Sequence, residues 1–156
     1  TGLVAPPVWD VENPYSRIFA SAAVFLPLRL GIEPVLALRG GGATVWGEYP
    51  FQESAFLGGS HTLRGFQRER FAGDAMVFGN AELRVPLVEM ELLVRGNLGI
   101  SGLADAGRVY VDGDSPGGWH HAAGGSIWFA TPALSVSATY AYGEDHRFYA
   151  DIGLPF

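Results

Sequence analysis

The sequence has 156 residues with 22 glycines, no cysteine, 17% charged residues and a formal net charge of −6. About 100–200 residues make one domain, so a second independent core is not expected. Soluble domains average about 25% charged residues; the scarcity of charge excludes a polar disordered chain, and the absence of cysteine excludes a disulfide framework. The ten basic residues are all arginine, against 16 acids, so no basic patch is available for nucleic acid.

The chain begins with Thr1 and lacks a charged segment followed by an apolar one, so we expect a mature form or a fragment. The stretch from Ser115 to Gly143 contains no Asp, Glu, Lys or Arg and is long enough for a membrane-spanning helix. Glycines and Pro132 interrupt it, and its Ser and Thr residues recur at alternate positions. A helix is therefore not expected there.

Alternation of apolar and polar residues, the pattern of a strand with one apolar face, dominates the chain. In the segment 74–87, Glu82 and Arg84 share the polar face, and in 91–109 Asp105 shares its face with Arg95 and Ser101. These segments run about nine to fifteen residues, whereas globular strands average about five or six and a strand tilted across a bilayer needs about nine to eleven. The predicted strands are 16–26, 33–45, 74–87, 91–109, 118–130, 133–142 and 146–156.

The connections between these strands alternate between short and long. Those at 46–73 and 110–117 are long and most others are short, which is typical of an outer-membrane barrel with long outer loops and short periplasmic turns. We therefore predict an all-β fold, an antiparallel transmembrane β-barrel of about seven or eight strands. Thr1–Val11 is a poor eighth strand because of Pro6 and Pro7. Eight strands enclose room only for side chains, so either the loop 46–73 stays outside or a second half-barrel widens the lumen.

Two motifs lie in the long loop and in the strand 91–109. The loop reads Leu63-Arg64-Gly65-Phe66 after a Gly-Gly pair, and the strand reads Leu103-Ala104-Asp105-Ala106-Gly107. From about Tyr15 to the terminal Phe, the chain resembles the C-terminal half of the BamA-like outer-membrane assembly and two-partner secretion transporter superfamily, also called bacterial surface antigens. That family has an aliphatic-Arg-Gly-aromatic loop motif and an aromatic-x-Asp-x-Gly strand motif, in which Leu103 replaces the aromatic residue. The matching residues are Leu63, Arg64, Gly65, Phe66, Asp105 and Gly107.

The resemblance implies that the loop folds back into the lumen and that Arg64 pairs with Asp105 on the inner wall. The polar face of Asp105 supports this pairing independently. We hypothesise a water-poor ion pair that anchors the loop tip; the alternative is a solvated loop arginine and a turn aspartate. Glu82 and Arg84 either extend this network or merely solvate a wet lumen.

Other polar residues form no pattern for catalysis or metal binding. His120 and His121 are adjacent, so in a strand they point to opposite faces. No Gly-x-Ser-x-Gly motif is present, and the loop glycines are not followed by a helix, as a phosphate cradle would require. We therefore expect no catalytic residue, no metal and no cofactor, and the chain is not predicted to be an enzyme.

The resemblance implies that residues 1–156 form the C-terminal barrel region, part of a 16-stranded barrel, of a bacterial outer-membrane protein that inserts or translocates polypeptides. The implied partners are outer-membrane lipid, unfolded or nascent outer-membrane or secreted polypeptides, and a missing N-terminal half-barrel or a second copy. The last strand, with Phe148, Gly153 and Phe156, is the candidate seam where a client strand adds. The alternatives are a barrel that anchors a surface or periplasmic enzyme such as a lipase, and an unrelated soluble lipocalin-type barrel.

Overall fold

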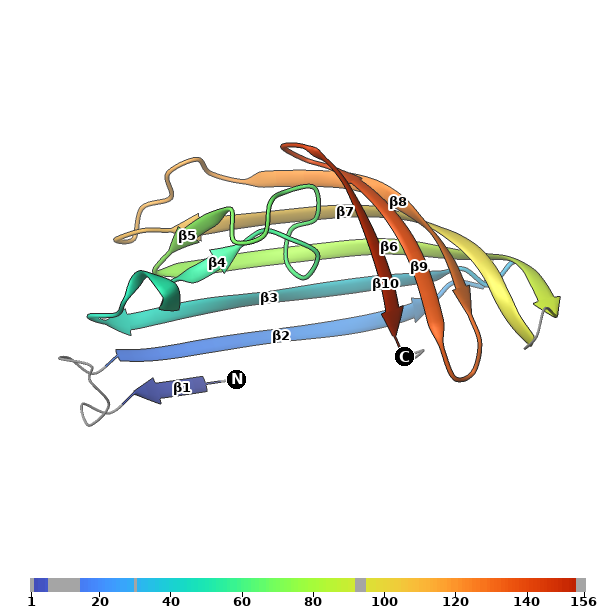
Figure 1. The fold of residues 1–156 in the computed structure, drawn as a ribbon, viewed down its shortest axis with the longest axis horizontal. Coiled ribbons are helices and arrows are strands. Elements are labelled where there is room, and N and C mark those ends of the chain that lie inside the picture. Colours follow the sequence, from blue (N-terminus) through green and yellow to red (C-terminus); the bar gives the residue numbers. More distant parts are fainter. Residues whose placement is uncertain (1, 6–14, 30, 92–94, 154–156) are drawn as a thin grey trace.

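The computed structural model describes residues 2–5, 15–29, 31–91 and 95–153. In these residues eight strands form one antiparallel sheet in the order β1-β2-β3-β6-β7-β8-β9-β10 (Figure 1). The all-β antiparallel fold is thus confirmed, and a strand within Thr1–Val11 supplies the eighth. The strands are β1 (Gly2–Ala5), β2 (Tyr15–Pro27), β3 (Val35–Gly47), β6 (Ala75–Glu91), β7 (Arg95–Tyr110), β8 (His120–Ala130), β9 (Ser135–Tyr142) and β10 (His146–Gly153).

The two faces of the sheet differ as the alternation predicts. Directly paired residues of antiparallel strands point to the same side, so the register places Asp105 beside Asn80 on the inner face and Ser101 beside Ser126. The outer face carries large apolar side chains that remain exposed, among them Ile100, Ile127 and Ile152. An apolar outer face and a polar inner face are the pattern of a barrel wall that meets lipid.

Strand length changes along the sheet. The central strands β6 and β7 have 17 and 16 residues, whereas β9 and β10 have 8 each. The register between β6 and β7 shifts between Pro86 and Val88, where proline cannot donate a ladder hydrogen bond. The β9–β10 hairpin crosses the direction of the long strands steeply (Figure 1).

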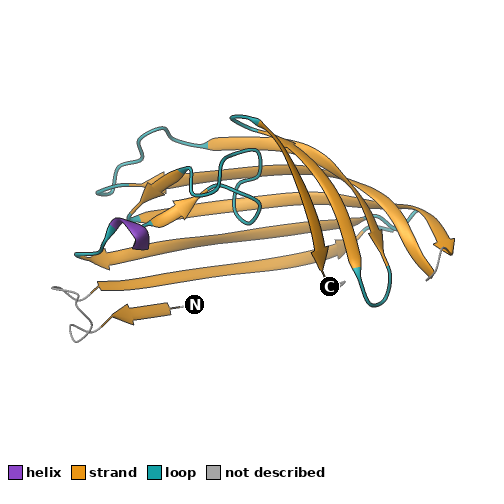
Figure 2. Ribbon diagram, in the orientation of Figure 1, coloured by secondary structure: helices purple, strands orange, loops and turns teal. Residues whose placement is uncertain are grey.

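The long connection after β3 folds onto the sheet. It contains the short 3₁₀ helix η1 (Phe51–Glu53) and a two-stranded sheet of β4 (Ala55–Leu57) and β5 (Phe71–Gly73), seen beside the long strands in Figure 2. We call residues 48–74 the plug loop. Its Leu57 and Leu63 are fully buried, so of the two alternatives for this loop, the one in which it stays outside is wrong. Buried side chains of the plug loop and the inner wall form one core: Tyr15, Ala43, Val45, Ala55, Leu57, Leu63, Phe66, Met76, Phe78, Val109 and Ala122.

The sheet is open among the described residues. There, β1 is paired only with β2, and β10 only with β9. The structure is therefore a partial barrel wall with its plug loop seated near one end. Among the described residues, no helix is long and apolar enough to cross a membrane.

Candidate functional site

The tip of the plug loop is fixed to the inner wall by Arg64 and Asp105. The Arg64 guanidinium donates from Nη2 to Oδ1 of Asp105 at 2.7 Å and from Nε to Oδ2 at 2.8 Å, and the backbone N–H of Arg64 donates to Oδ2 at 3.0 Å. The side chain of Asp105 is 0% exposed and that of Arg64 is 14% exposed. The structure thus brings these two predicted residues into a bidentate, water-poor contact, the geometry in which an Arg–carboxylate pair is strongest.

Glu82 extends this contact along β6. Its Oε2 accepts from Nη1 of Arg64 at 3.1 Å, and its Oε1 accepts from Nε of Arg84 at 2.9 Å. Ser101 of β7 also donates to Oε1, at 3.1 Å. Glu82 therefore links Arg64 to Arg84 in one network, in line with the first of the two roles weighed for it. Burial works against the charge of Arg64, but its hydrogen bonds with Asp105 and Glu82 and their negative charges raise the pKa of the guanidinium above its usual value.

The residues just before Arg64 are shaped for this placement. The Thr62 hydroxyl bonds both the N–H and the carbonyl of Gly58, and the N–H of Leu63 donates to the carbonyl of Gly59 at 3.2 Å. Gly58 has φ +129°, and a Cβ there would lie 2.3 Å from the carbonyl of Gln67. The Gly-Gly pair therefore allows a compact loop that other residues would distort.

Wall side chains also bind the backbone of the tip. Arg39 of β3 donates to the carbonyl of His61 at 2.8 Å, and Asn80 of β6 donates to the carbonyl of Thr62 at 3.0 Å. Three neighbouring strands therefore supply side chains that bind the tip. Sequence reasoning did not identify Arg39 or Asn80, although both occupy inward positions of the alternation.

Leu63 and Gly107 belong to the packing of the site. Leu63 is fully buried. A Cβ at Gly107 would lie 2.9 Å from both terminal methyl groups of Leu57, so glycine at this position of β7 makes room for the buried Leu57. The Asp105-Ala106-Gly107 segment thus serves two purposes: its aspartate binds the loop tip and its glycine admits the loop core.

Gly65 and Phe66 contact the β9–β10 hairpin, and Phe66 also belongs to the core shared with the inner wall. Gly65 has φ +81°, and a Cβ on it would lie 2.6 Å from the backbone nitrogen of Gly143. The Phe66 ring packs against Gly143, where a Cβ would lie 2.4 Å from the ring. Phe66 also contacts Phe71 and His120, with ring centroids 5.5 and 5.9 Å away.

A second tie at the base of the plug loop has no counterpart in the sequence analysis. The Tyr49 hydroxyl donates to the Asp74 carboxylate, and the N–H of Asp112 donates to the same carboxylate at 2.6 Å. Burial, followed by the hydrogen bond and negative charge of Asp74, raises the pKa of Tyr49 to about 12. The hydrogen bond from Tyr49 lowers the pKa of Asp74. Asp74 thus joins the plug loop to the turn after β7.

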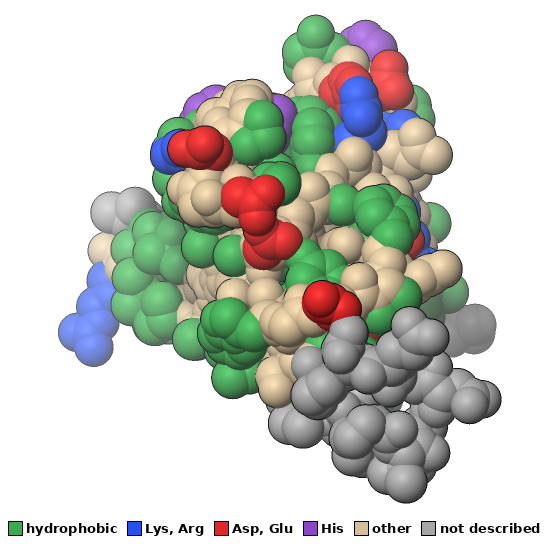
Figure 3. Space-filling view, turned by 90° about the vertical axis from the view of Figure 1, so that its left-hand side faces the viewer, with side chains coloured by type: hydrophobic (Ala, Val, Ile, Leu, Met, Phe, Trp, Pro, Cys, Tyr) green, Lys and Arg blue, Asp and Glu red, His purple; other side chains and the backbone are tan. Residues whose placement is uncertain are grey.

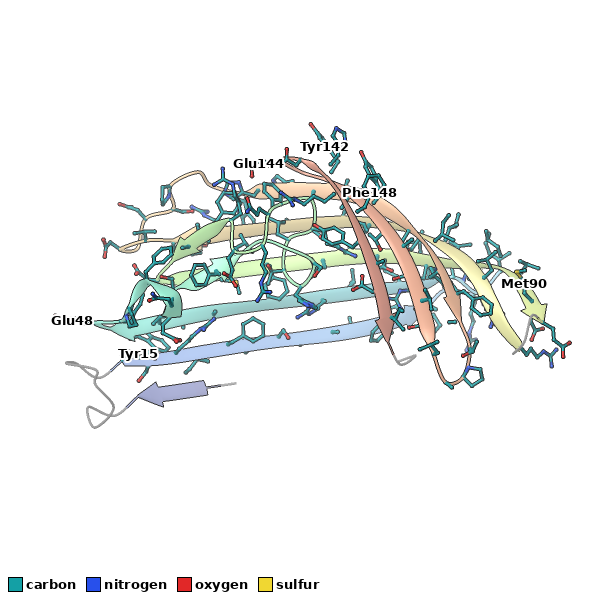
Figure 4. All side chains as sticks on the ribbon, in the orientation of Figure 1. Tyr15, Glu48, Met90, Tyr142, Glu144 and Phe148 are labelled. Atoms are coloured by element: carbon teal, nitrogen blue, oxygen red, sulfur yellow. The ribbon has the colours of Figure 1, made fainter. Side chains whose placement is uncertain are left out.

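The remaining predicted residues lie away from this anchor. Phe148 points outward from β10 and is 81% exposed, in the group with Tyr142 at the upper edge of Figure 4. Gly153 ends β10, and Phe156 lies outside the described residues. Arg95, on the same face as Asp105, lies at the far end of β7 and pairs with Glu89.

The inner face below the loop tip is hollowed. A cavity of about 670 Å³ is bounded by Arg64, Glu82 and Arg84 on one side and reaches across β8 to β10. On the far side, apolar residues such as Val136 and Ile152 line the cavity together with polar and aromatic ones: Ser126, Trp128, Ser137, Thr139, Tyr149 and Asp151.

The described residues hold no cluster of three or more His, Asp or Glu side chains placed to bind a metal ion. The paired histidines diverge as adjacent strand residues must, since His120 is paired with Gly107 on the inner face and His121 with Ala106 on the outer face. Acidic side chains are spread over the loop end of the molecule among apolar ones (Figure 3).

An antiparallel wall with an apolar outer face and an ion-paired loop folded onto its inner face defines a class: outer-membrane β-barrels with a loop inside the lumen. The chain matches the Omp85 superfamily domain over residues 9–156 and belongs to that superfamily. This membership confirms the resemblance drawn from the two motifs and excludes the soluble lipocalin-type barrel. The superfamily is characteristic of the bacterial outer membrane, and its members are transporters and assembly factors for unfolded polypeptides.

Proposed function

We propose that this chain inserts or translocates polypeptides in the outer membrane, with no covalent chemistry, and that the free edge of β10 receives the client strand. The observation that supports this is the open sheet. In the described residues β10 pairs with β9 through His146–Gly153, and its other edge has no partner strand there. An extended peptide can satisfy the backbone groups of such an edge by adding as a further strand.

The topology specifies the direction of the added strand. Every neighbouring pair in the sheet is antiparallel, so the first and eighth strands, β1 and β10, run in opposite directions. A client strand that continues the pattern at β10 runs in the direction of β1 and β9. A strand running like β2 would pair in parallel, which is less stable per residue.

We further propose that more strands complete the lumen, from an N-terminal half-barrel or a second copy. A closed barrel of eight strands holds side chains only, yet the inner face here carries a folded plug loop with its own two-stranded sheet and buried core. A wall of this curvature with such a loop requires a wider barrel. The anchored tip would then keep the plug loop from blocking the open part of the lumen.

Site-specific photo-cross-linking tests the edge. A photoreactive residue replaces Asp151 on β10 or, as the control, Ser126 on β8, which has a partner strand on each side. The full chain in lipid vesicles is mixed with a small outer-membrane barrel protein diluted from urea. We expect many cross-links to the client at position 151 and few at position 126.

Equal cross-linking at both positions would contradict an edge-specific role. No cross-link at either position would favour the alternative that the barrel anchors an enzyme, because an anchor needs no contact with unfolded polypeptide.

A further inference from the structure

The loop tip makes a second set of contacts, with the outer end of the β9–β10 hairpin. We propose that Gly65, Phe66 and Arg70 clamp this hairpin, so that the seated plug loop fixes the position of the β10 edge. Tyr149 and Glu144 are the positioning residues on the hairpin side. The consequence for client strands rests on the proposed function, whereas the clamp itself rests on the contacts that follow.

Backbone hydrogen bonds join the loop tip to the hairpin turn. The carbonyl of Gly65 accepts from the N–H groups of Glu144 and Asp145, both at 3.2 Å. The N–H of Gly65 donates to the Tyr149 hydroxyl at 3.1 Å. Both backbone groups of one loop residue are therefore occupied by the hairpin, and Tyr149 reaches them from the inner face of β10.

Close packing makes the junction specific. Neither Gly65 nor Gly143 has space for a Cβ, because each would collide with the opposite segment at 2.6 Å or less. The Phe66 ring closes over Gly143, and Phe71 stacks on His120 of β8 with centroids 3.9 Å apart. Glycines at both contact points let the two backbones approach without intervening side chains.

An ion pair completes the junction at the surface. Arg70 donates from Nε to Oε2 of Glu144 at 2.7 Å and from Nη2 to Oε1 at 2.6 Å. Glu144 lies at the outer tip of the hairpin, near Tyr142 (Figure 4). The pair is exposed and adds little stability by itself, but its bidentate geometry fixes the relative orientation of the two segments.

The clamp matters because the hairpin has few other attachments. Through the sheet it is joined only along β8 and β9, by the pairs from Ala123 with Tyr142 to Ala130 with Ser135, within the described residues. Arg64 binds the wall strands β6 and β7, and the next two residues bind the hairpin. Three consecutive residues therefore connect the centre of the wall to its terminal edge, so movement of the tip moves that edge.

Distances between spin labels test the clamp, because the chain has no cysteine of its own. Labels are attached at Ile100→Cys on β7 and Ile152→Cys on β10, two exposed outer-face positions away from the clamp. In the full chain in lipid vesicles, we expect one narrow distance peak. Tyr149→Phe combined with Arg70→Ala should abolish that single peak and give a broad distribution.

Two controls separate the clamp from general damage. Tyr140→Phe removes a hydroxyl that bonds His146 on the same hairpin and not the loop, and Arg68→Ala removes an exposed pair within the loop; both should keep the narrow peak. Arg70→Glu alone should broaden the peak, and the charge reversal Arg70→Glu with Glu144→Arg should restore it. Such a restoration would not occur if Arg70→Glu had simply prevented folding.

An unchanged peak in the double variant would overturn the clamp. If that variant does not fold, Tyr149→Phe alone decides in the same way. Client cross-linking from position 151 is measured separately on the same proteins. If the peak broadens but no variant captures the client, the clamp is supported and the proposed function is overturned. If the client is captured but the peak is unchanged, the proposed function is supported and the clamp is overturned.

Discussion

The central wall and the terminal hairpin hold the same loop tip by different means. At the wall, β6 and β7 offer carboxylates to Arg64, and the Asp105 side chain is 0% exposed. At the hairpin, the contacts are backbone hydrogen bonds, glycine packing and the exposed pair of Arg70 with Glu144. The two regions also differ in strand length, since the wall strands are about twice as long as those of the hairpin.

From this difference we infer that the attachment of the loop tip to the wall is permanent, whereas its attachment to the hairpin can be released. A buried ion pair leaves an uncompensated charge when either partner is removed, so it opens only at a high energetic cost. At the hairpin, the pair of Arg70 with Glu144 is exposed, and water can replace its hydrogen bonds with a small net change. We therefore expect the tip to stay on the wall when the hairpin moves, and the predictions below test that order of strength.

Removing one partner of the wall pair should have the largest effect. Arg64→Ala should lower the free energy of unfolding by about 3–5 kcal/mol, because the buried carboxylate of Asp105 is left unpaired. Asp105→Ala should cost less, because Arg64 keeps its ion pair with Glu82. Urea unfolding from lipid vesicles, followed by the fluorescence of the four tryptophans, measures this loss. Arg68→Ala, which breaks an exposed pair in the same loop, is the control and should change little.

The double variant shows whether the two residues act as a pair. If they do, Arg64→Ala with Asp105→Ala should cost much less than the sum of the single changes. Additive losses would contradict the coupling and would indicate that each residue acts through other partners.

Gly65→Ala should come next, because it disturbs the contact with the hairpin. Gly65 and Gly113 have nearly equal φ values, +81° and +83°, but only Gly65 lacks space for a Cβ; Gly113 has nothing within 4 Å. Both substitutions carry the cost of a left-handed alanine, about 1–2 kcal/mol. The collision with Gly143 should add about 1–3 kcal/mol at Gly65 alone. If Gly65→Ala and Gly113→Ala lowered the free energy of unfolding equally, the close approach to Gly143 would not be the reason for glycine at position 65.

The wall part of the site could be predicted from the sequence because two local signals agree on it. The alternation places Asp105 and Glu82 on one face, and the register then brings them to the loop. Strand ends were predicted to within a few residues for most strands. In β6, however, the strand continues to Glu91 past Pro86 through the register shift, which an alternation pattern does not show.

The hairpin part could not be predicted, because it depends on contacts between segments that are distant in the sequence. Arg70 and Glu144 are 74 residues apart, and neither belongs to a motif. Their contact depends on the fold of the plug loop and on the steep course of β9 and β10. The short strands β4 and β5 were missed for a related reason: three residues each are too few for a periodic pattern. The sequence has 22 glycines and does not distinguish Gly143 among them. Its role is identified only from the structure, in which the Phe66 ring lies against it.

Tyr49→Phe should have a moderate effect at the base of the plug loop. The substitution removes the hydroxyl that donates to Asp74 and should cost about 0.5–1.5 kcal/mol. The pKa of Tyr49 is about 12 in the folded protein, above that of a free tyrosine, so its contribution is present at neutral pH and is lost as the pH rises from about 10 through about 12. Absorbance of the phenolate should show a late-titrating component that disappears in Tyr49→Phe and titrates earlier in Asp74→Asn. An unchanged titration in Asp74→Asn would contradict the assignment.

Acidification should give the smallest effect, confined to the hairpin. The hydrogen bond and positive charge of Arg70 lower the pKa of Glu144, with smaller electrostatic contributions from Arg147 and His120. A carboxyl with a lowered pKa in the folded state stabilises the structure above its ordinary pKa and loses that contribution as the pH falls through the lowered value. We therefore expect the distance peak between labels at positions 100 and 152 to broaden only below the ordinary range of a glutamate, while the wall pair keeps the tip in place. Glu144→Gln should weaken the pair at neutral pH and remove the pH dependence. Broadening that persists unchanged in Glu144→Gln would contradict the assignment of the acid response to Glu144.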